Sequence, residues 1–434
     1  MIKVSNYLIL VAFFITLEIY RVPIMGYNLT LYHLLLAAAL FLGLLTILQN
    51  VRLKIDRGVK MVLGTLIIFG GYSFLTFLKN VDIMRREVSS MFVAELIGYA
   101  MVLIIPVFIS NRKNLRRLTI AFLSSAIFVY VGAFWHMFVF VTRGEKITGV
   151  PFWYIFTPSE HVLAYLEAAA GFAGFPRFVL PFSSAAGTGL FLSLSGILLL
   201  ALALHHIGSK RKMPWGLILF NVINFLCLLG TFARASWAVF LVGSMVTLWY
   251  FHKFKLISFR RVILTFVLVA GFLLAIISIV PMGDEFTRIV MFRFDPEYTR
   301  MSDIGHLESR LLALSYWTES PITGLGVGGF WERPRGGIHS HSTYFTILVE
   351  RGIIGLFLFL AFLFQVYQLL KRKMRMARKS NDTIMLAYNI GFLSSLIGVL
   401  LGHFLCQMSS EVVWLYYGII LAYANLRFPQ TESS

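Results

Sequence analysis

Long apolar runs recur along the whole chain and are separated by shorter polar or charged segments. Most of them contain about 20 residues, the length that an α-helix needs to cross the hydrocarbon core of a bilayer. Twelve runs fit this description, at residues 7–20, 28–48, 59–78, 91–110, 118–141, 184–206, 214–231, 235–251, 262–281, 342–370, 384–405 and 411–426. We therefore predict an all-α integral membrane protein with about 12 transmembrane helices, because a membrane β-barrel would show alternating segments of about 10 residues.

The first apolar run follows a basic start, as it would in a secretory signal peptide. No small-residue cleavage site comes after it, and further apolar runs begin at once. We predict that this run is the first transmembrane helix.

Basic residues mark alternate connections between the predicted helices. The chain is 58% hydrophobic and only 13% charged, yet its formal net charge is +18. Basic residues collect on the cytoplasmic side of membrane proteins. The basic connections are residues 52–60, 112–117, 210–212, 253–261 and 371–379. This alternation predicts cytoplasmic N- and C-termini, and it accounts for the charge better than binding to nucleic acid does.

Two of the predicted outer connections are long, at residues 142–183 and 282–341. Connections of more than about 15 residues without structure of their own are uncommon and are often functional. We expect the second one, between predicted helices nine and ten, to be partly helical and to carry catalytic groups. Residues 1–434 are otherwise predicted to form a single polytopic membrane domain.

Three arginines lie on the predicted outer face. Arg177 is in the first long connection, Arg234 lies in "TFARAS" between predicted helices seven and eight, and Arg310 is in the second long connection. An arginine at a membrane boundary can simply extend toward lipid phosphate. The alternative is that Arg177 and Arg234 hold a phosphate or pyrophosphate group, which a guanidinium binds with two parallel hydrogen bonds.

Titratable groups also cluster at the start of predicted helix ten, in "HSHSTYFTILVERGIIG". His339 and His341 precede the helix, and Glu350 and Arg351 lie inside its apolar run. Residues 352–370 already suffice to cross the membrane, so the turns before them either stand above the apolar layer or face a wet cavity. His341 is then either part of a helix-capping segment beside Ser340 and Ser342 or a general base, since its pKa lies near working pH.

The remaining motifs argue against a metal or nucleotide cofactor. A catalytic zinc needs three protein ligands, and "HSH" offers two, with no third ligand evident nearby. Cys227 and Cys406 lie in apolar runs without metal-site spacing, and the chain has no phosphate-binding P-loop and no serine-hydrolase motif. We predict no metal site and no cofactor.

Three segments together resemble the O-antigen ligase and O-antigen polymerase family of bacterial membrane glycosyltransferases. His341-Ser342 is followed by nine residues and then Gly352-Ile-Ile-Gly355, which resembles the family's main motif. "SPITGLGVGGF" resembles its proline- and glycine-rich turn. "TFARAS" resembles a T-x-S-R segment, although Ala233 stands where the family commonly has Ser.

The resemblance implies a metal-independent, inverting glycosyl transfer at the outer face of a bacterial plasma membrane. It implies a glycan on undecaprenyl pyrophosphate as the donor and a glycolipid or glycan hydroxyl as the acceptor. His341 would be the base, and Arg177, Arg234 and Arg310 would hold the pyrophosphate. His339, Glu350 and Arg351 would support these residues. The motifs do not separate a ligase acting on a lipid A core from a polymerase or a protein glycosyltransferase, and the oligomeric state stays open.

A multi-span secondary transporter or a flippase for lipid-linked glycans is the alternative. It would need charges buried within several spans. The candidates are Glu18, His33, Glu95, His136 and His403. Packing and contacts with lipid headgroups account for such residues equally well.

The predicted absence of a catalytic metal leads to a first test. Treating the purified protein with EDTA should leave the rate of glycan transfer unchanged, because a histidine base and arginine side chains need no metal. The rate is measured as product formed from a lipid-linked oligosaccharide. Loss of activity that zinc restores would contradict the prediction and favour a zinc site at "HSH".

Overall fold

The computed structural model describes most of the chain outside its long connections. The described residues are 2–17, 21–24, 27–48, 55–82, 86–143, 171–172, 175–176, 178, 184–209, 214–258, 260, 291, 295–333, 340–407 and 411–427. The predicted helix at 262–281 lies outside them, as do Arg177, His339 and most of the connection 142–183.

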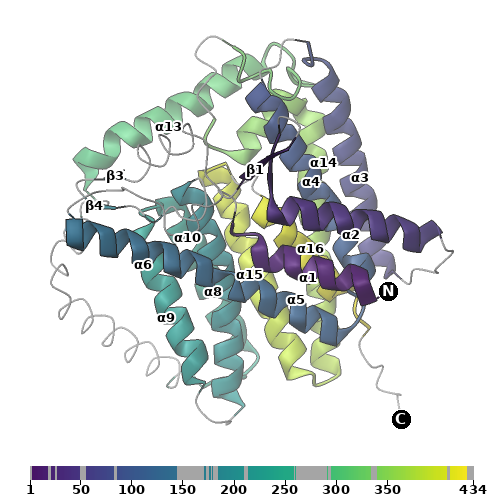
Figure 1. Ribbon diagram of the computed structural model, residues 1–434, viewed down its shortest axis with the longest axis vertical. Helices are drawn as coiled ribbons and strands as arrows, with labels where there is room; N and C mark the ends of the chain where they lie inside the picture. Colours follow the sequence, from purple (N-terminus) through teal and green to yellow (C-terminus); the bar gives the residue numbers. More distant parts are fainter. Residues whose placement is uncertain are drawn as a thin grey trace.

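The described residues form a helical bundle (Figure 1). Its helices are α1 (Ile2–Phe14), α2 (Leu31–Leu48), α3 (Arg57–Leu78), α4 (Arg86–Phe108), α5 (Arg112–Ser124), α6 (Ala126–Arg143), α8 (Ala185–Gly208), α9 (Trp215–Gly230), α10 (Arg234–Lys253), α13 (Pro296–Trp317), α14 (Thr343–Lys379), α15 (Thr383–Leu405) and α16 (Glu411–Asn425). Helical structure therefore occurs at every predicted run that the structure describes. The long connection 282–341 contains α13, so it is partly helical.

Two short antiparallel hairpins modify the all-α prediction. They pair β1 (Arg21–Ile24) with β2 (Tyr27–Thr30), and β3 (Gly171–Phe172) with β4 (Phe175–Pro176). The first hairpin takes up the start of the predicted run 28–48, and α2 begins only after Thr30, whose backbone N–H donates to Nδ1 of His33.

Six helices among the described residues are long and apolar enough to cross a membrane. They are α3, the run Arg112–Trp135, α8, α10, α14 and α15. Shorter apolar helices occupy Val4–Phe14, Leu31–Thr46, Phe92–Phe108 and Trp215–Gly230. The chain is thus a multi-pass helical membrane protein, while the count of twelve spans and the side on which each end lies stay predictions.

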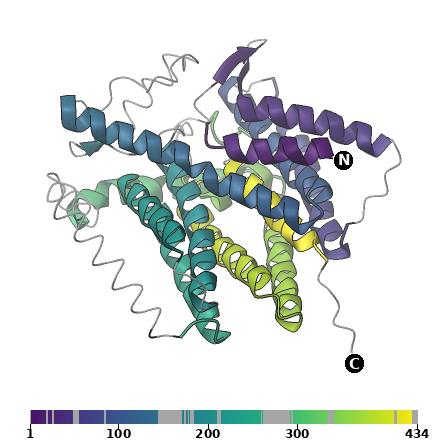
Figure 2. The same ribbon diagram turned by 60° about the horizontal axis from the view of Figure 1, so that its bottom comes forward.

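The predicted run 118–141 is interrupted at Ser125, between α5 and α6. The Ser125 hydroxyl donates to the Phe122 carbonyl, and the Ser125 carbonyl accepts a hydrogen bond from Thr16 of the segment after α1. Hydroxyl groups that bond to the backbone in this way compete with regular helix bonding. Figures 1 and 2 show α5 and α6 following one another obliquely across the bundle.

Helix α16 lies at the centre of the bundle (Figure 1), and every residue from Val412 to Asn425 is buried. It packs extensively on α4, where Gly98 makes room for the indole of Trp414: a Cβ at Gly98 would lie 2.4 Å from that ring. A helix that is apolar on all sides belongs in a core, and α16 is such a helix, packed mainly on α4 and also against α3, α5 and α14.

Helix α14 is broken near the end that follows His341. Gly352 has φ 64° and ψ −168°, which are not helical values, so two helical segments meet there at a sharp bend. Such a bend leaves backbone groups on both sides without their usual helical partners. Those groups need partners from elsewhere in the chain.

The segment after α13 supplies these partners. The N–H groups of Leu325 and Gly326 donate to the carbonyls of Val349 and Glu350, at 2.9 and 2.8 Å. In return, the N–H of Ile353 donates to the Pro321 carbonyl at 3.0 Å. We call residues 324–329 the glycine turn. The turn, together with Pro321 just before it, is docked into the break of α14 by backbone hydrogen bonds in both directions.

Only glycine fits at the closest points of this contact. A Cβ at Gly324 would lie 2.3 Å from the Glu350 carbonyl carbon, and a Cβ at Gly326 would lie 2.4 Å from Nδ2 of Asn80. Both glycines also have positive φ, which residues with a side chain adopt at a cost. The Asn80 side chain, just after α3, donates to the carbonyls of Leu325 and Val327, both at 3.1 Å. The glycine turn is therefore held between α3 and α14.

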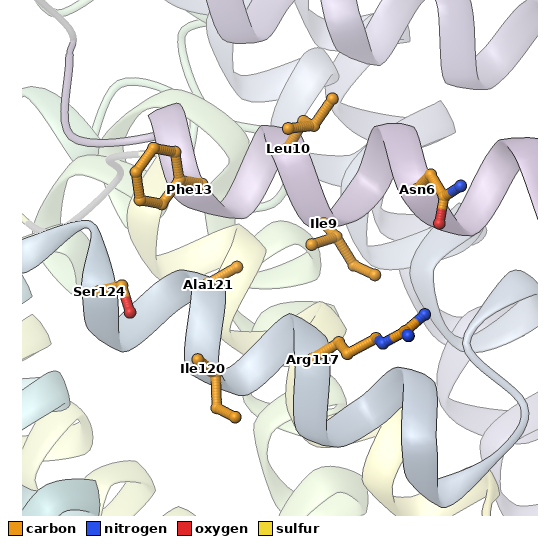
Figure 3. Close-up of a pocket in the computed structure, with 8 residues that line it drawn as sticks. All are labelled: Asn6, Ile9, Leu10, Phe13, Arg117, Ile120, Ala121 and Ser124. Atoms are coloured by element: carbon orange, nitrogen blue, oxygen red, sulfur yellow. The ribbon is translucent and has the colours of Figure 1, made fainter.

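A shallow apolar groove of about 540 Å³ lies between α1 and α5, far along the chain from the glycine turn. Figure 3 shows Ile9 of α1 and Ala121 of α5 on the facing sides of the two helices, with Leu10 and Ile120 at the outer borders of the groove. Arg117 and Asn6 lie near one another at one end of this view. The groove shares no residue with the histidines and arginines predicted to be functional.

Replacing Gly352 with alanine should destabilise the protein. The new Cβ would lie 2.2 Å from the Ile322 carbonyl oxygen at a residue with φ 64°, so we expect a loss of about 2–4 kcal/mol in the free energy of unfolding. The measurement is thermal or denaturant unfolding in detergent.

Gly64→Ala is the matched control, because Gly64 lies within α3 and has open space where its Cβ would be. It should be neutral or more stable by up to about 1 kcal/mol. Equal unfolding midpoints for the two variants would show that the bend at Gly352 does not constrain the fold.

Candidate functional site

Arg234 is placed by a three-residue turn, residues 231–233, between α9 and α10. Phe232 adopts a left-handed conformation with φ 51°, and Ala233 is the N-cap, so α10 begins at Arg234. Gly230 closes α9 against the ring of Phe178, whose backbone N–H donates to the Gly230 carbonyl at 2.9 Å. Arg234 therefore stands at the positive end of a helix, beside the segment that follows Arg177 in the sequence.

Three charged or titratable side chains lie along one face of α13. Asp303, His306 and Arg310 are spaced three and four residues apart, which places them on one side of a helix over roughly 10 Å. Asp303 forms an ion pair with Arg234 of α10, in which Nη1 lies 3.3 Å from Oδ2 and Nη2 makes a second contact with Oδ1. The face of α13 is thereby joined to the start of α10.

His341 lies between two anchored serines just before α14. The Ser342 hydroxyl donates to the His403 carbonyl at 3.0 Å, and the Ser340 hydroxyl donates to the Ser342 carbonyl at 2.8 Å. Both serines are fully buried, whereas His341 is partly exposed and has φ 52°. A left-handed conformation is unusual for a residue with a side chain. Surrounding contacts thus fix the backbone that presents His341.

The rings of His341 and His306 are in direct contact. Their centroids are 4.2 Å apart and their planes meet at 78°, a T-shaped arrangement. Burial lowers the pKa of His306, Arg310 and Arg234 lower it further, and Asp303 opposes them. The lowered pKa keeps His306 uncharged at neutral pH, and among the described residues its buried Nδ1 atom has no hydrogen-bond partner.

Arg310 ties α13 to the end of α15. Its Nη2 donates to the Leu405 carbonyl at 3.1 Å, and its guanidinium lies 5.3 Å from the centre of the Phe404 ring. A cation at the last carbonyls of a helix is favourable. Burial raises the pKa of the neighbouring Cys406 thiol to about 12, so that thiol stays protonated.

Arg234, Asp303, His306, Arg310 and His341 together form what we call the histidine cluster. Of the predicted site residues, the structure links His341, Arg234 and Arg310 through α13. Arg177 and His339 lie outside the described residues. The sequence analysis did not single out Asp303 or His306. The available signal was the helical spacing of charged and titratable residues in "DIGHLESR".

Glu350 and Arg351 lie elsewhere, beneath the glycine turn, and they correct one expectation from the sequence. Their side chains do not line a wet cavity, because they are 9% and 3% exposed and are enclosed by protein. Their position relative to the membrane surface stays a prediction. The Glu350 carboxylate accepts a hydrogen bond from the Gly328 N–H at 3.0 Å, and Arg351 forms an ion pair with Glu95 of α4. Both residues stabilise the break in α14.

The glycine turn itself is not a phosphate cradle. The N–H groups of Leu325, Gly326 and Gly328 donate to carbonyls or to the carboxylate of α14, and the N–H of Gly329 donates to the Gly326 carbonyl. These donors are thus occupied by protein acceptors. Within the described part of the chain, no group of three His, Cys, Asp or Glu side chains is arranged to hold a metal ion.

The geometry defines a multi-pass helical membrane protein with a break in α14 at Gly352 and a histidine just before that helix. Residues 219–360 match the family model described as O-antigen ligase. The resemblance drawn from the motifs is thus confirmed, and the matched residues contain the whole histidine cluster. No curated protein matches the chain. The family supports a membrane enzyme of the glycosyltransferase type.

Breaking the buried ion pair should be costly. Arg351→Gln would leave Glu95 charged without its cation, and we expect a loss of about 3–5 kcal/mol in the free energy of unfolding. The double variant Glu95→Gln with Arg351→Gln should recover part of this loss, because neither charge then stays unpaired. Unfolding in detergent measures both, and a double variant no more stable than Arg351→Gln would contradict the pairing.

Proposed function

We propose that the protein transfers a glycan from an undecaprenyl-pyrophosphate carrier to a hydroxyl group of an acceptor, with inversion at the anomeric carbon. The observation that supports this most is the joining of His341, Arg234 and Arg310 by a single face of α13. A base and two cations then lie on connected elements at one end of the bundle. The proposed setting is the outer face of a bacterial plasma membrane.

In the proposed reaction, His341 removes the proton of the acceptor hydroxyl. The acceptor oxygen attacks the anomeric carbon as the bond from that carbon to the pyrophosphate oxygen breaks, and the pyrophosphate carrier leaves with the electron pair. A neutral histidine suits this step because its pKa lies near working pH. The fixed backbone of His341, with its serine anchors on both sides, favours a defined orientation of the base.

Arg234 would stabilise the charge that develops on the leaving pyrophosphate. Arg234 pairs with Asp303, and both side chains are partly exposed. A pyrophosphate carries more negative charge than one carboxylate and matches the guanidinium fork, so we propose that it takes the place of Asp303. Arg177, next to the packed Phe178 in the sequence, is the proposed second cation, and Arg310 stands one turn of α13 beyond His306.

The transporter alternative finds less support in the described part of the chain. Each buried titratable residue there that a transporter could use has its own partner within the protein. Glu95 pairs with Arg351, His33 contacts Glu411 at 3.3 Å, and both ring nitrogens of His403 bond to hydroxyls at 3.1 Å. These pairs join different helices, as packing contacts do. Glu18 and the side chain of His136 lie outside the described residues.

The test is a transfer assay with purified protein, a lipid-linked oligosaccharide and a hydroxyl acceptor. We expect a new glycosidic product with the wild type and a loss of at least about a hundredfold in rate with His341→Ala, because general-base catalysis contributes about 10²–10⁴-fold. Donor binding should survive in this variant.

His252→Ala serves as the control, since His252 is exposed near the end of α10 and away from the histidine cluster. Unchanged product formation by His341→Ala would remove the base assignment. If the lipid-linked glycan moves across the membrane of proteoliposomes and no new glycosidic bond forms, the enzyme hypothesis fails and the transporter hypothesis is favoured.

A further inference from the structure

His306 is the residue in the histidine cluster to which neither the motifs nor the proposed chemistry assigns a task. It lies on α13, half-buried, with its ring against that of His341 at 4.2 Å between centroids. A histidine that served only to pack the interior would be unfavourable at this position, because a buried polar atom without a hydrogen-bond partner costs free energy. Its Nδ1 atom has no hydrogen-bond partner in the part of the chain that the structure describes.

The groups around His306 keep it uncharged. Arg310 lies one turn further along α13, Arg234 approaches from α10, and Asp303 lies between them as the only nearby anion in the described part of the chain. Two cations and burial oppose a positive charge on His306, and the carboxylate opposes them only in part. An uncharged imidazole has one nitrogen that donates and one that accepts a hydrogen bond.

We propose that His306 is a positioning residue for His341: once His341 has taken the proton of the acceptor hydroxyl, its ring turns out of the T-shaped contact and donates a hydrogen bond to Nδ1 of His306. This inference rests on the proposed function. The proton moves from the acceptor oxygen to one ring nitrogen of His341, and the N–H on the other ring nitrogen donates to His306. Because His306 stays uncharged, it stabilises the positive charge on His341 instead of repelling it.

This arrangement has the logic of a base that is oriented by a third group. It differs from a pair with a carboxylate, because the nearest acid, Asp303, is engaged by Arg234. Nδ1 of His306 is then the acceptor for the protonated ring of His341.

Two substitutions separate packing from hydrogen bonding. His306→Phe keeps an aromatic ring against His341 but removes the acceptor, and we expect kcat to fall about tenfold to a hundredfold, with the donor KM little changed. In His306→Asn the amide oxygen can stand where Nδ1 lies, so this variant should recover most of the loss. Glu308→Gln is the control on the exposed side of α13 and should behave as the wild type.

The pH profile gives a readout that packing alone would not move. A partner for the charged form of His341 raises its pKa, so removing that partner in His306→Phe should shift the acidic limb of the kcat profile to lower pH by about one unit. An unaltered limb and an unaltered kcat in His306→Phe would overturn the proposal. An equal loss of kcat in His306→Phe and His306→Asn would do the same.

Nuclear magnetic resonance tests the contact without any glycan transfer. The chain has 10 histidines, and protein labelled with ¹³C at the imidazole Cε1 gives one signal for each, with that of His341 absent in His341→Ala. The titration midpoint of the His341 signal should fall in His306→Phe and return in His306→Asn. If the wild type forms no glycosidic product, the proposed function fails. If the titration midpoint of the His341 signal is the same in the wild type and in both His306 variants, the role of His306 is refuted.

Discussion

The backbone hydrogen bonds between the glycine turn and the break in α14 hold the elements of the candidate site in one arrangement. A membrane helix with a sharp bend exposes carbonyl and N–H groups that lipid cannot satisfy. Here Leu325, Gly326 and Pro321 satisfy them in both directions. The same bonds fix where the chain leaves α13 and where α14 starts, and so they relate the face of α13 to His341.

The buried charges beneath the turn follow from the same bend. Arg351 packs its side chain back over Gly355, where a Cβ would lie 2.3 Å from that of Arg351. The guanidinium of Arg351 then reaches Glu95 of α4. The Tyr72 hydroxyl of α3 donates to the Arg351 carbonyl at 3.1 Å. The two glycines of the G-x-x-G motif thus have different tasks: one permits the bend, and the other makes room for the arginine beside it.

The sequence predicted the helices well because their apolar runs need no knowledge of neighbours. It also singled out His341, Arg234 and Arg310, since each lies in a motif or at a predicted membrane boundary; the structure links them through α13, and their roles stay predictions. It could not predict the bend at Gly352, because a glycine within an apolar run is compatible with a straight helix. It could not assign Glu350 and Arg351 to the interior either, since their partners Gly328 and Glu95 are distant in the sequence. His306 escaped notice because its role depends on contact with another element.

The electrostatics of the histidine cluster connect the two halves of the proposed reaction. The negative charge of Asp303 partly offsets the positive charge of Arg234. Asp303 on α13 raises the pKa of His306, and Arg234 on α10 lowers it. A bound pyrophosphate would bring further negative charge to the same cations, and negative charge near an imidazole favours its protonated form. Under the proposed function, donor binding therefore favours a proton on His341, while burial and Arg310 still oppose a proton on His306. Under the same proposal, Asp303 pairs with Arg234 until the pyrophosphate takes its place.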